Sequence, residues 1–309
     1  QKLVLGPWGH TDKATRSAGG HDFGPEAAMD LPRAYLRWFD KWLKGIDNGI
    51  DKEPLVSLFV MGSNAWAHGP TYPLPETKFE KWYLAGGGNA NTSKGDGKLT
   101  REVRGAEGKP DHYTYDPGDP TPDPRFFEAP KDKDGKPLPK AEERKRQKAY
   151  HADLTAGRKD ILVYTTEPFK EAYTFAGPMT AVLYASSSAK DTDWHVRLCE
   201  VDEKGEVFLL AAGKLRARYR ESMSQPKLLE PDRVYEYRID LWQTGLTVKP
   251  GGRLQVEVTS AAFPLFSRNL NTGGHNEKET AFVPAKQTIY HDRDHPSHVL
   301  LPALPGFKR

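Results

Sequence analysis

The chain has little of several features that mark whole classes of protein. It contains a single cysteine, Cys199, which excludes an intrachain disulfide. Its 45 basic and 42 acidic residues leave a formal net charge of +3, so the chain lacks the strongly basic balance of a nucleic-acid or membrane-surface binder. It also contains no apolar run long enough to span a bilayer. We therefore expect no nucleic-acid partner and no membrane partner. The compartment stays open between cytoplasm and export.

Turn-forming and aromatic residues are plentiful instead. The 309 residues include 28 Gly and 25 Pro, and 11% are aromatic, which favours a folded chain with many short strands. From Leu55 onward, short apolar runs are separated by clusters of Gly, Pro, Asp and Asn. This pattern predicts a mostly β chain, a β-sandwich, and within that class a jelly roll. The strands are expected at residues 56–60, 79–84, 161–164, 180–185, 194–201, 208–210, 215–219, 234–241 and 254–259.

The first fifty residues have a different pattern. An apolar strand at Leu3–Leu5 is followed by a loop and then by a helix expected over residues 25–44, which ends at Gly45. The helix has an aromatic face that needs a large partner, made of Tyr35, Trp38, Phe39 and Trp42. We therefore divide the chain into an α/β segment, residues 1–50, and a β-sandwich domain, residues 51–309. Residues 86–150 are weakly periodic, and the basic run at 140–148 is interpreted as a solvated loop or helix face.

His10 is the main candidate for catalysis, because it follows directly after the first strand in Leu3-Val4-Leu5-Gly6-Pro7-Trp8-Gly9-His10. The triad histidine of an α/β-hydrolase lies on such a loop, where it acts as the general base. A histidine considered alone is more often structural. The nucleophile elbow G-x-S-x-G is absent from the chain, and Gly62-Ser63-Asn64 lacks its first glycine, so we interpret that fragment as a turn.

Other polar groups have two interpretations each. Asp191 and Asp193 form either a carboxylate pair or part of a turn, and Cys199 is either a small buried hydrophobe or a reactive thiol. Three arginines at alternate positions either pair with carboxylates of an adjoining domain or are solvated. They are Arg216, Arg218 and Arg220. A histidine- and aspartate-rich stretch near the end has metal-like spacing, but we interpret it as a turn and a strand and expect no metal. Its members are His291, Asp292, Asp294, His295 and His298.

Several longer segments together resemble one family. LVLGPWGH and HDFGPEAAMDLPRAYLRWFDKWLKG resemble the end of the catalytic domain in the cocaine esterase / X-Pro dipeptidyl-peptidase group of serine hydrolases, the S15-like peptidases. The remainder resembles the C-terminal, galactose-binding-like jelly roll of that group. The matching pieces are YDPGDPTP (115–122), DILVYTTEP (160–168), DTDWHVRLCEVDEKG (191–205), GKLRARYRES (213–222), SAAFPLFSRNLNTG (260–273) and TIYHDRDHPSHVLLPALP (288–305).

The resemblance implies that His10 is the triad histidine and that the serine, the aspartate and the oxyanion-hole donors lie upstream of Gln1. It implies a partner, the missing N-terminal catalytic domain, and a small ester, amide or peptide substrate, with no cofactor. The chain alone is then expected to be inactive, and a homo-oligomer is compatible with it. The loop Phe263–Phe266, with Arg268 and Asn269, is expected on the active-site side.

A binding module is the alternative function. Jelly rolls often bind carbohydrate, and a free-standing module of this kind would need neither His10 nor the aromatic helix. The aromatic side chains expected to be exposed for such binding are Trp66, Tyr72 and Trp82.

Overall fold

A small mixed sheet with one long helix forms the N-terminal part of the molecule. The computed structural model describes residues 1–9, 15–18, 21–103, 108–128 and 130–307. Strands β1 (Leu3–Leu5), β4 (Val56–Val60) and β5 (Ala65–Gly69) pair in the order β1-β4-β5. β1 and β4 are parallel, and helix α1 (Leu31–Lys44) lies in the connection between them. Parallel strands joined through a helix are the α/β arrangement expected of this segment.

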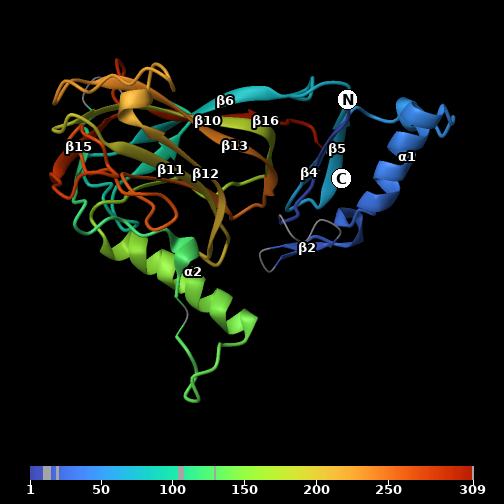
Figure 1. Ribbon diagram of the computed structural model, residues 1–309, viewed down its shortest axis with the longest axis horizontal. Coiled ribbons are helices and arrows are strands. Elements are labelled where there is room, and N and C mark those ends of the chain that lie inside the picture. Colours follow the sequence, from blue (N-terminus) through green and yellow to red (C-terminus); the bar gives the residue numbers. More distant parts are fainter. Residues whose placement is uncertain (10–14, 19–20, 104–107, 129, 308–309) are drawn as a thin grey trace.

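The rest of the β1–β4 connection consists of short elements. β2 (Ser17–Ala18) and β3 (His21–Asp22) form a two-stranded ribbon, and 3-10 turns η1 (Pro25–Ala27) and η2 (Ile50–Lys52) precede and follow α1. In Figure 1, α1 lies at one end of the molecule, beyond β4 and β5.

Helix α1 begins later than predicted and ends where predicted. The expected start near Pro25 is wrong, because Pro25–Ala27 is a separate 3-10 turn followed by an extended Ala28. The helix instead begins after Asp30, whose side chain accepts a hydrogen bond from the Arg33 amide at 3.0 Å and caps the first turn. Gly45 adopts a left-handed conformation, φ 71°, which terminates the helix.

The larger sheet supplies the β-sandwich. Its path runs β12-β11-β14-β9-β7-β6-β16-β10-β15-β8, and β13 pairs with β10 beside that path. The strands are β6 (Lys78–Ala85), β7 (Lys98–Thr100), β8 (Asp111–Tyr115), β9 (Leu162–Thr165), β10 (Tyr173–Ser187), β11 (Asp193–Val201), β12 (Val207–Arg216), β13 (Tyr235–Val248), β14 (Arg253–Thr259), β15 (Ala285–Tyr290) and β16 (His298–Ala303).

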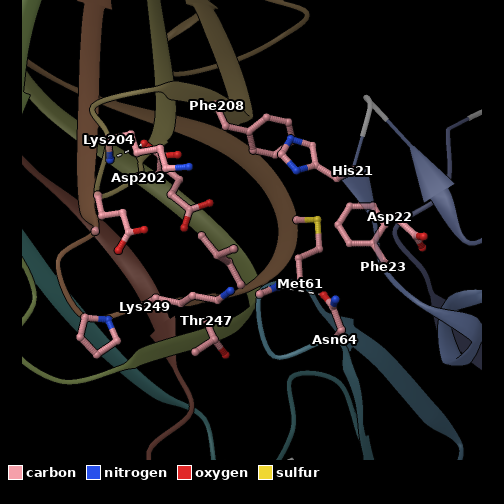
Figure 2. Close-up of a pocket in the computed structure, with 16 residues that line it drawn as sticks. His21, Asp22, Phe23, Met61, Asn64, Asp202, Lys204, Phe208, Thr247 and Lys249 are labelled. Atoms are coloured by element: carbon pink, nitrogen blue, oxygen red, sulfur yellow. Dashed lines mark hydrogen bonds between the residues drawn. The ribbon is translucent and has the colours of Figure 1, made fainter. Parts of the chain in front are cut away.

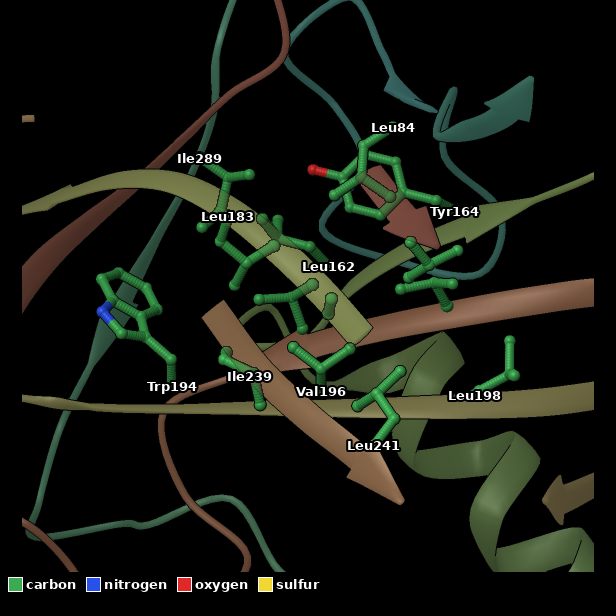
Figure 3. Packing of buried hydrophobic residues seen from close by; sticks show 14 of the residues in the cluster. Leu84, Leu162, Tyr164, Leu183, Trp194, Val196, Leu198, Ile239, Leu241 and Ile289 are labelled. Atoms are coloured by element: carbon green, nitrogen blue, oxygen red, sulfur yellow. The ribbon is translucent and has the colours of Figure 1, made fainter. Parts of the chain in front are cut away.

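The core lies between the two halves of this sheet. Figure 3 shows Leu162, Val196 and Leu198 of β9 and β11 packed against side chains from β10 and β13, with Leu183 and Ile239 among them. These five side chains are all buried. Alternate side chains of a strand point to the same face of a sheet, so Trp194, Val196 and Leu198 of β11 enter this core together. The predicted class, a mostly β chain with a β-sandwich, is confirmed.

The two sheets meet where β4 crosses β13. The Met61 amide donates to the Gly245 carbonyl at 2.9 Å, and the Thr247 amide donates to the Met61 carbonyl at 2.8 Å. A Cβ atom at Gly245 would lie 2.7 Å from the Phe59 carbonyl oxygen, so the close approach of these backbones requires a glycine. This junction joins the small sheet to the sandwich.

An excursion between β8 and β9 covers part of the outer face of the sandwich. It contains the 3-10 turn η3 (Pro124–Phe126) and helix α2 (Lys140–Gly157), which lies under the sandwich in Figure 1. Most of α2 is exposed, as the mixed charges at 140–148 suggest, but His151, Leu154 and Thr155 are buried against the sheet. The helix therefore rests on the sheet through its C-terminal half.

Most of the predicted strands coincide with observed ones, and one pair differs. The runs 208–210 and 215–219 are not two strands: β12 is continuous, and Ala217–Tyr219 is a 3-10 turn, η4. Gly213, between these runs, serves packing and not a turn. A Cβ atom there would lie 2.0 Å from the Asp240 carbonyl oxygen of β13.

Neither α1 nor α2, the α-helices of the described residues, is long and apolar enough to cross a membrane.

Candidate functional site

The segment that leads to His10 is held by a tryptophan. His10 itself lies outside the described residues, whereas the chain is described up to Gly9. The Trp8 indole nitrogen donates a hydrogen bond to the Ala27 carbonyl, and the Trp8 ring lies 6.0 Å from the Trp66 ring. Gly6 leaves room for this ring, because a Cβ atom there would lie 2.5 Å from it. The loop after β1 is therefore fixed immediately before His10.

The aromatic face of α1 is open. None of the residues of this fully described helix is buried, and Tyr35, Phe39 and Trp42 are 57%, 52% and 57% exposed. The rings of Trp38 and Trp42 lie 5.7 Å apart. The charged face of the helix, in contrast, is tied to its surroundings, since Arg37 pairs with Glu53 at 2.6 Å. An apolar face of this size is typical of a surface that another part of a protein covers.

A large hollow of about 1190 Å³ lies between α1 and the small sheet. Its lining includes Leu3 and Val4 of β1, Trp8, and Trp38 and Phe39 of α1. In the described part of the chain β1 pairs with β4 alone, so its other edge carries unpaired backbone groups. An open strand edge beside an apolar hollow can accept a further strand and its side chains.

A second, smaller hollow of about 380 Å³ lies where the β2–β3 ribbon faces the sandwich (Figure 2). His21 and Phe23 form one wall, and the His21 ring meets the Phe208 ring edge-on at 4.5 Å. Met61 lies between this wall and Lys249. Burial lowers the pKa of His21. The pocket combines aromatic walls with charged side chains, among them Asp202, Lys204 and Lys249.

A half-buried carboxylate also lines this pocket. Burial and the nearby Asp202 raise the pKa of Glu200, and Lys249 opposes that shift. The sequence patterns do not point to His21, Glu200 or Lys249. They come from separate segments, and no local motif connects them.

Arg216, Arg218 and Arg220 make their polar contacts within the sandwich. For Arg216 and Arg218, pairing with an adjoining domain and exposure to solvent are therefore both wrong predictions. Arg216 contacts Asp193 at 2.9 Å and Arg218 contacts Asp191 at 2.8 Å. The Asn269 amide donates to both carboxylates, at 2.8 Å each.

The same network explains how the carboxylates of Asp191 and Asp193 can be buried. Both are buried, and the pKa of Asp191 is raised, because burial outweighs the hydrogen bond from Asn269 and the charge of Arg218. Arg220 donates to the carbonyls of Ala217 and Lys227, at 3.2 and 2.6 Å. The DTDWH and RNLNTG segments are thus partners in one buried ion-pair network, and the two aspartates do not form an open acid–base site. Asp191 lies in the connection between β10 and β11, as the turn interpretation predicted.

The histidines near the end of the chain do not converge. His291 is buried and hydrogen bonded to Asp111 at 2.9 Å, His295 contacts Asp292 at 3.3 Å, and His298 bonds to the Pro296 carbonyl at 2.7 Å. Among the described residues, these side chains form no cluster with metal-binding spacing.

Cys199 lies in a buried polar cluster between α2 and the sheet. Its sulfur is 3.7 Å from the Glu257 Oε1 atom, which is 2.9 Å from His151 Nε2. The Arg197 Nε atom donates to Glu257 Oε2 at 2.7 Å. Burial and the Glu257 charge raise the pKa of the thiol well above its ordinary value, so Cys199 is not a reactive thiolate in this state. Its predicted burial is confirmed.

The aromatic residues considered for carbohydrate binding do not form an exposed platform. Trp82 is 6% exposed and packs against Phe169 and Tyr173, so its predicted exposure is wrong. Trp66 is half-buried, and its indole nitrogen donates to the Glu26 carbonyl at 2.8 Å. Tyr72 is half-buried as well.

Two further segments have structural roles. Ser63 caps the β4–β5 turn by donating to the Val60 carbonyl at 3.1 Å, which confirms that Gly62–Asn64 is a turn. The loop 263–266 is ordered by two backbone hydrogen bonds to Thr121 and Asp123, of 3.0 and 2.8 Å.

A family of known domains and a known esterase together match almost the whole chain. Residues 48–300 match the family described as the X-Pro dipeptidyl-peptidase C-terminal non-catalytic domain. The cocaine esterase of Rhodococcus sp. is 36% identical over 308 residues, which are 98% of this chain and 51% of that protein.

Two solved structures agree with these matches. An aminopeptidase from a marine sediment Thaumarchaeota archaeon superposes with a TM-score of 0.73 at 29% identity, covering 98% of this chain and 49% of that one. An α-amino acid ester hydrolase superposes with a TM-score of 0.72 at 26% identity, covering 98% and 50%. The chain therefore spans about half the length of these relatives.

Proposed function

The chain belongs to the family of X-Pro dipeptidyl-peptidase C-terminal non-catalytic domains, and from this premise we propose that it works as the C-terminal part of a serine hydrolase. The enzyme cleaves ester or amide bonds, either acyl or X-Pro dipeptidyl bonds, through an acyl-enzyme. His10 takes the proton of the nucleophile and returns it to the leaving group. The serine, the aspartate and the oxyanion-hole donors come from a catalytic part outside this chain.

The exposed apolar surface of the N-terminal segment carries this proposal. The face of α1, the hollow beside it and the free edge of β1 adjoin one another, and together they suit the docking of a further α/β sheet. A free-standing carbohydrate-binding module would need none of these features. The proposed division therefore assigns residues 1–50 to the catalytic unit and 51–309 to the sandwich, and β4 continues the small sheet across that division.

The geometry around Trp8 supports the assigned role of His10. A general base must be held within hydrogen-bonding reach of its nucleophile. Trp8 binds the Ala27 carbonyl and packs on Trp66, which restrains the backbone two residues before His10. The loop is thus positioned by residues of this chain before a catalytic part is added.

The test is hydrolysis of a p-nitrophenyl ester by the chain alone and by a polypeptide that joins it to the preceding catalytic part. We expect no turnover above background from the chain alone, because the nucleophile is elsewhere. The joined polypeptide should turn over, and His10→Ala should remove about 10³-fold or more of that rate. His275→Gln is the matched control: it changes an exposed histidine whose side chain is 62% accessible and should leave the rate unchanged.

Two results would contradict the proposal. One is turnover by the chain alone that His10→Ala abolishes, because the nucleophile would then lie in this chain. The other is full activity of the joined His10→Ala variant.

A further inference from the structure

The buried cluster under α2 brings together three kinds of metal ligand from three elements. His151 comes from α2, Cys199 from β11 and Glu257 from β14. Their imidazole nitrogen, sulfur and carboxylate oxygen all lie within 4.8 Å of one another, and all three residues are buried. In a search of the described residues for His, Cys, Asp and Glu side chains close enough to hold one metal ion, these three residues form the group found.

We propose that His151, Cys199 and Glu257 bind a divalent transition-metal ion of the Zn²⁺ type. Imidazole, thiolate and carboxylate are the donors that Zn²⁺ accepts in tetrahedral sites. Calcium and magnesium are unsuited to this set, because they require several oxygen ligands.

Two of the three distances between the donor atoms are close to those around a tetrahedral ion, and the third is at most 4.8 Å. With Zn–N and Zn–O bonds of about 2.0 Å and a Zn–S bond of about 2.3 Å, ligand atoms lie about 3.3–3.5 Å apart. The His151 Nε2 to Glu257 Oε1 separation is 2.9 Å and the Cys199 Sγ to Oε1 separation is 3.7 Å. Small side-chain shifts bring both pairs to the required separation.

Neighbouring groups hold the Glu257 carboxylate in place. Residues that hydrogen bond to the ligands of a metal ion have the same role in metal sites. The Gln255 side-chain amide donates to Glu257 Oε1 at 2.8 Å, and Arg197 Nε donates to Oε2 at 2.7 Å. Such hydrogen bonds fix the orientation of a ligating carboxylate.

Arg197 places a condition on the fourth ligand. Binding converts the Cys199 thiol to a thiolate and releases its proton to solvent, so the ion, thiolate, carboxylate and guanidinium together carry one net positive charge. An anionic fourth ligand, hydroxide or chloride, brings this charge to zero. The Nη1 and Nη2 atoms of Arg197 are buried with no hydrogen-bond partner among the described residues, which leaves donors for such an anion.

The metal would attach the excursion to the sandwich. α2 buries three side chains of its own against the sheet, His151, Leu154 and Thr155, and one of them is a ligand. A bond from His151 through the ion to β11 and β14 therefore couples the docking of α2 to metal binding.

The experiment uses the full chain, stripped with a chelator and titrated with Co²⁺. We expect one equivalent to bind with a thiolate-to-cobalt charge-transfer band in the near ultraviolet, and Zn²⁺ to displace it. Cys199→Val preserves the side-chain volume and should abolish the band. His295→Asn, in the separate histidine-rich stretch, should leave it unchanged. Zn²⁺ at a hundredfold excess over its Kd should raise the wild-type Tm by about 5 °C. It should also slow tryptic cleavage in 140–148.

A folded wild-type chain that shows no band would overturn the proposal, and so would an equal band in Cys199→Val. If Cys199→Val does not fold, Cys199→Ser replaces it, because a serine hydroxyl stays protonated, is a poor Zn²⁺ ligand and gives no sulfur charge-transfer band. A Zn²⁺-induced Tm shift that persists in that variant would equally overturn the assignment.

Discussion

His195 makes the sandwich sensitive to acid. It lies on β11, is 4% exposed and packs against the Phe266 ring at 5.7 Å. Burial, followed by the charges of Arg197 and Lys214, lowers its pKa from 6.5 to about 3, while Asp123 acts in the opposite direction and Arg216 in the same one. The folded state therefore keeps this imidazole neutral at pH values where the unfolded chain protonates it.

The sign and size of the effect follow from this difference. Below pH 6.5 the unfolded chain binds a proton that the folded chain does not, so stability falls as the pH falls towards about 3. Each pH unit in this window costs about 1.4 kcal/mol, and the full window costs about 4–5 kcal/mol. Between pH 7.5 and pH 5, the loss attributable to His195 is about 2 kcal/mol.

His195→Met keeps a side chain of similar size without the titrating group, and urea unfolding at several pH values measures the effect. The wild-type free energy of unfolding, relative to the variant, should fall by about 2 kcal/mol between pH 7.5 and pH 5. Val196→Ala, in the next, fully buried position of the same strand, should lower stability equally at every pH. If the difference in the free energy of unfolding between wild type and His195→Met does not vary with pH, the reasoning is refuted.

Two further predictions concern surfaces and ion pairs. Phe39→Glu in the exposed face of α1 should reduce self-association and hydrophobic-dye binding of the isolated chain. The control Lys44→Glu, on the same helix, should change neither. Equal dye binding by wild type and Phe39→Glu would contradict the docking surface. Arg218→Met leaves the buried Asp191 carboxylate without its cation and should cost about 3–5 kcal/mol in urea unfolding, against less than about 1 kcal/mol for Arg238→Met at the surface. A loss for Arg218→Met no larger than that for Arg238→Met would show that Asp191 is stabilised by other groups.

Local patterns were sufficient for the elements with strong periodicity. The alternating run at 194–201 and the apolar runs at 56–60 and 254–259 became β11, β4 and β14, because the period of two matches the pleat of a strand. Gly45 ended α1, because only a residue that tolerates a left-handed conformation fits there. Gly213 has a different requirement: the Asp240 backbone, 27 residues away in the chain, leaves no room for a Cβ atom there, and no local pattern records this contact.

The sequence by itself determined the class of fold and the family resemblance, since strand periodicity and the matching segments are local features of the chain. It also leads to the prediction that His10 is the general base. The tertiary structure alone decided which charges neutralise one another. Arg218 meets Asp191, and Arg197 meets Glu257. A charge on a strand is equally compatible with solvent, with another domain or with a buried partner. The partner is selected by the pairing of distant strands, and by the energetic cost of leaving a buried charge unpaired.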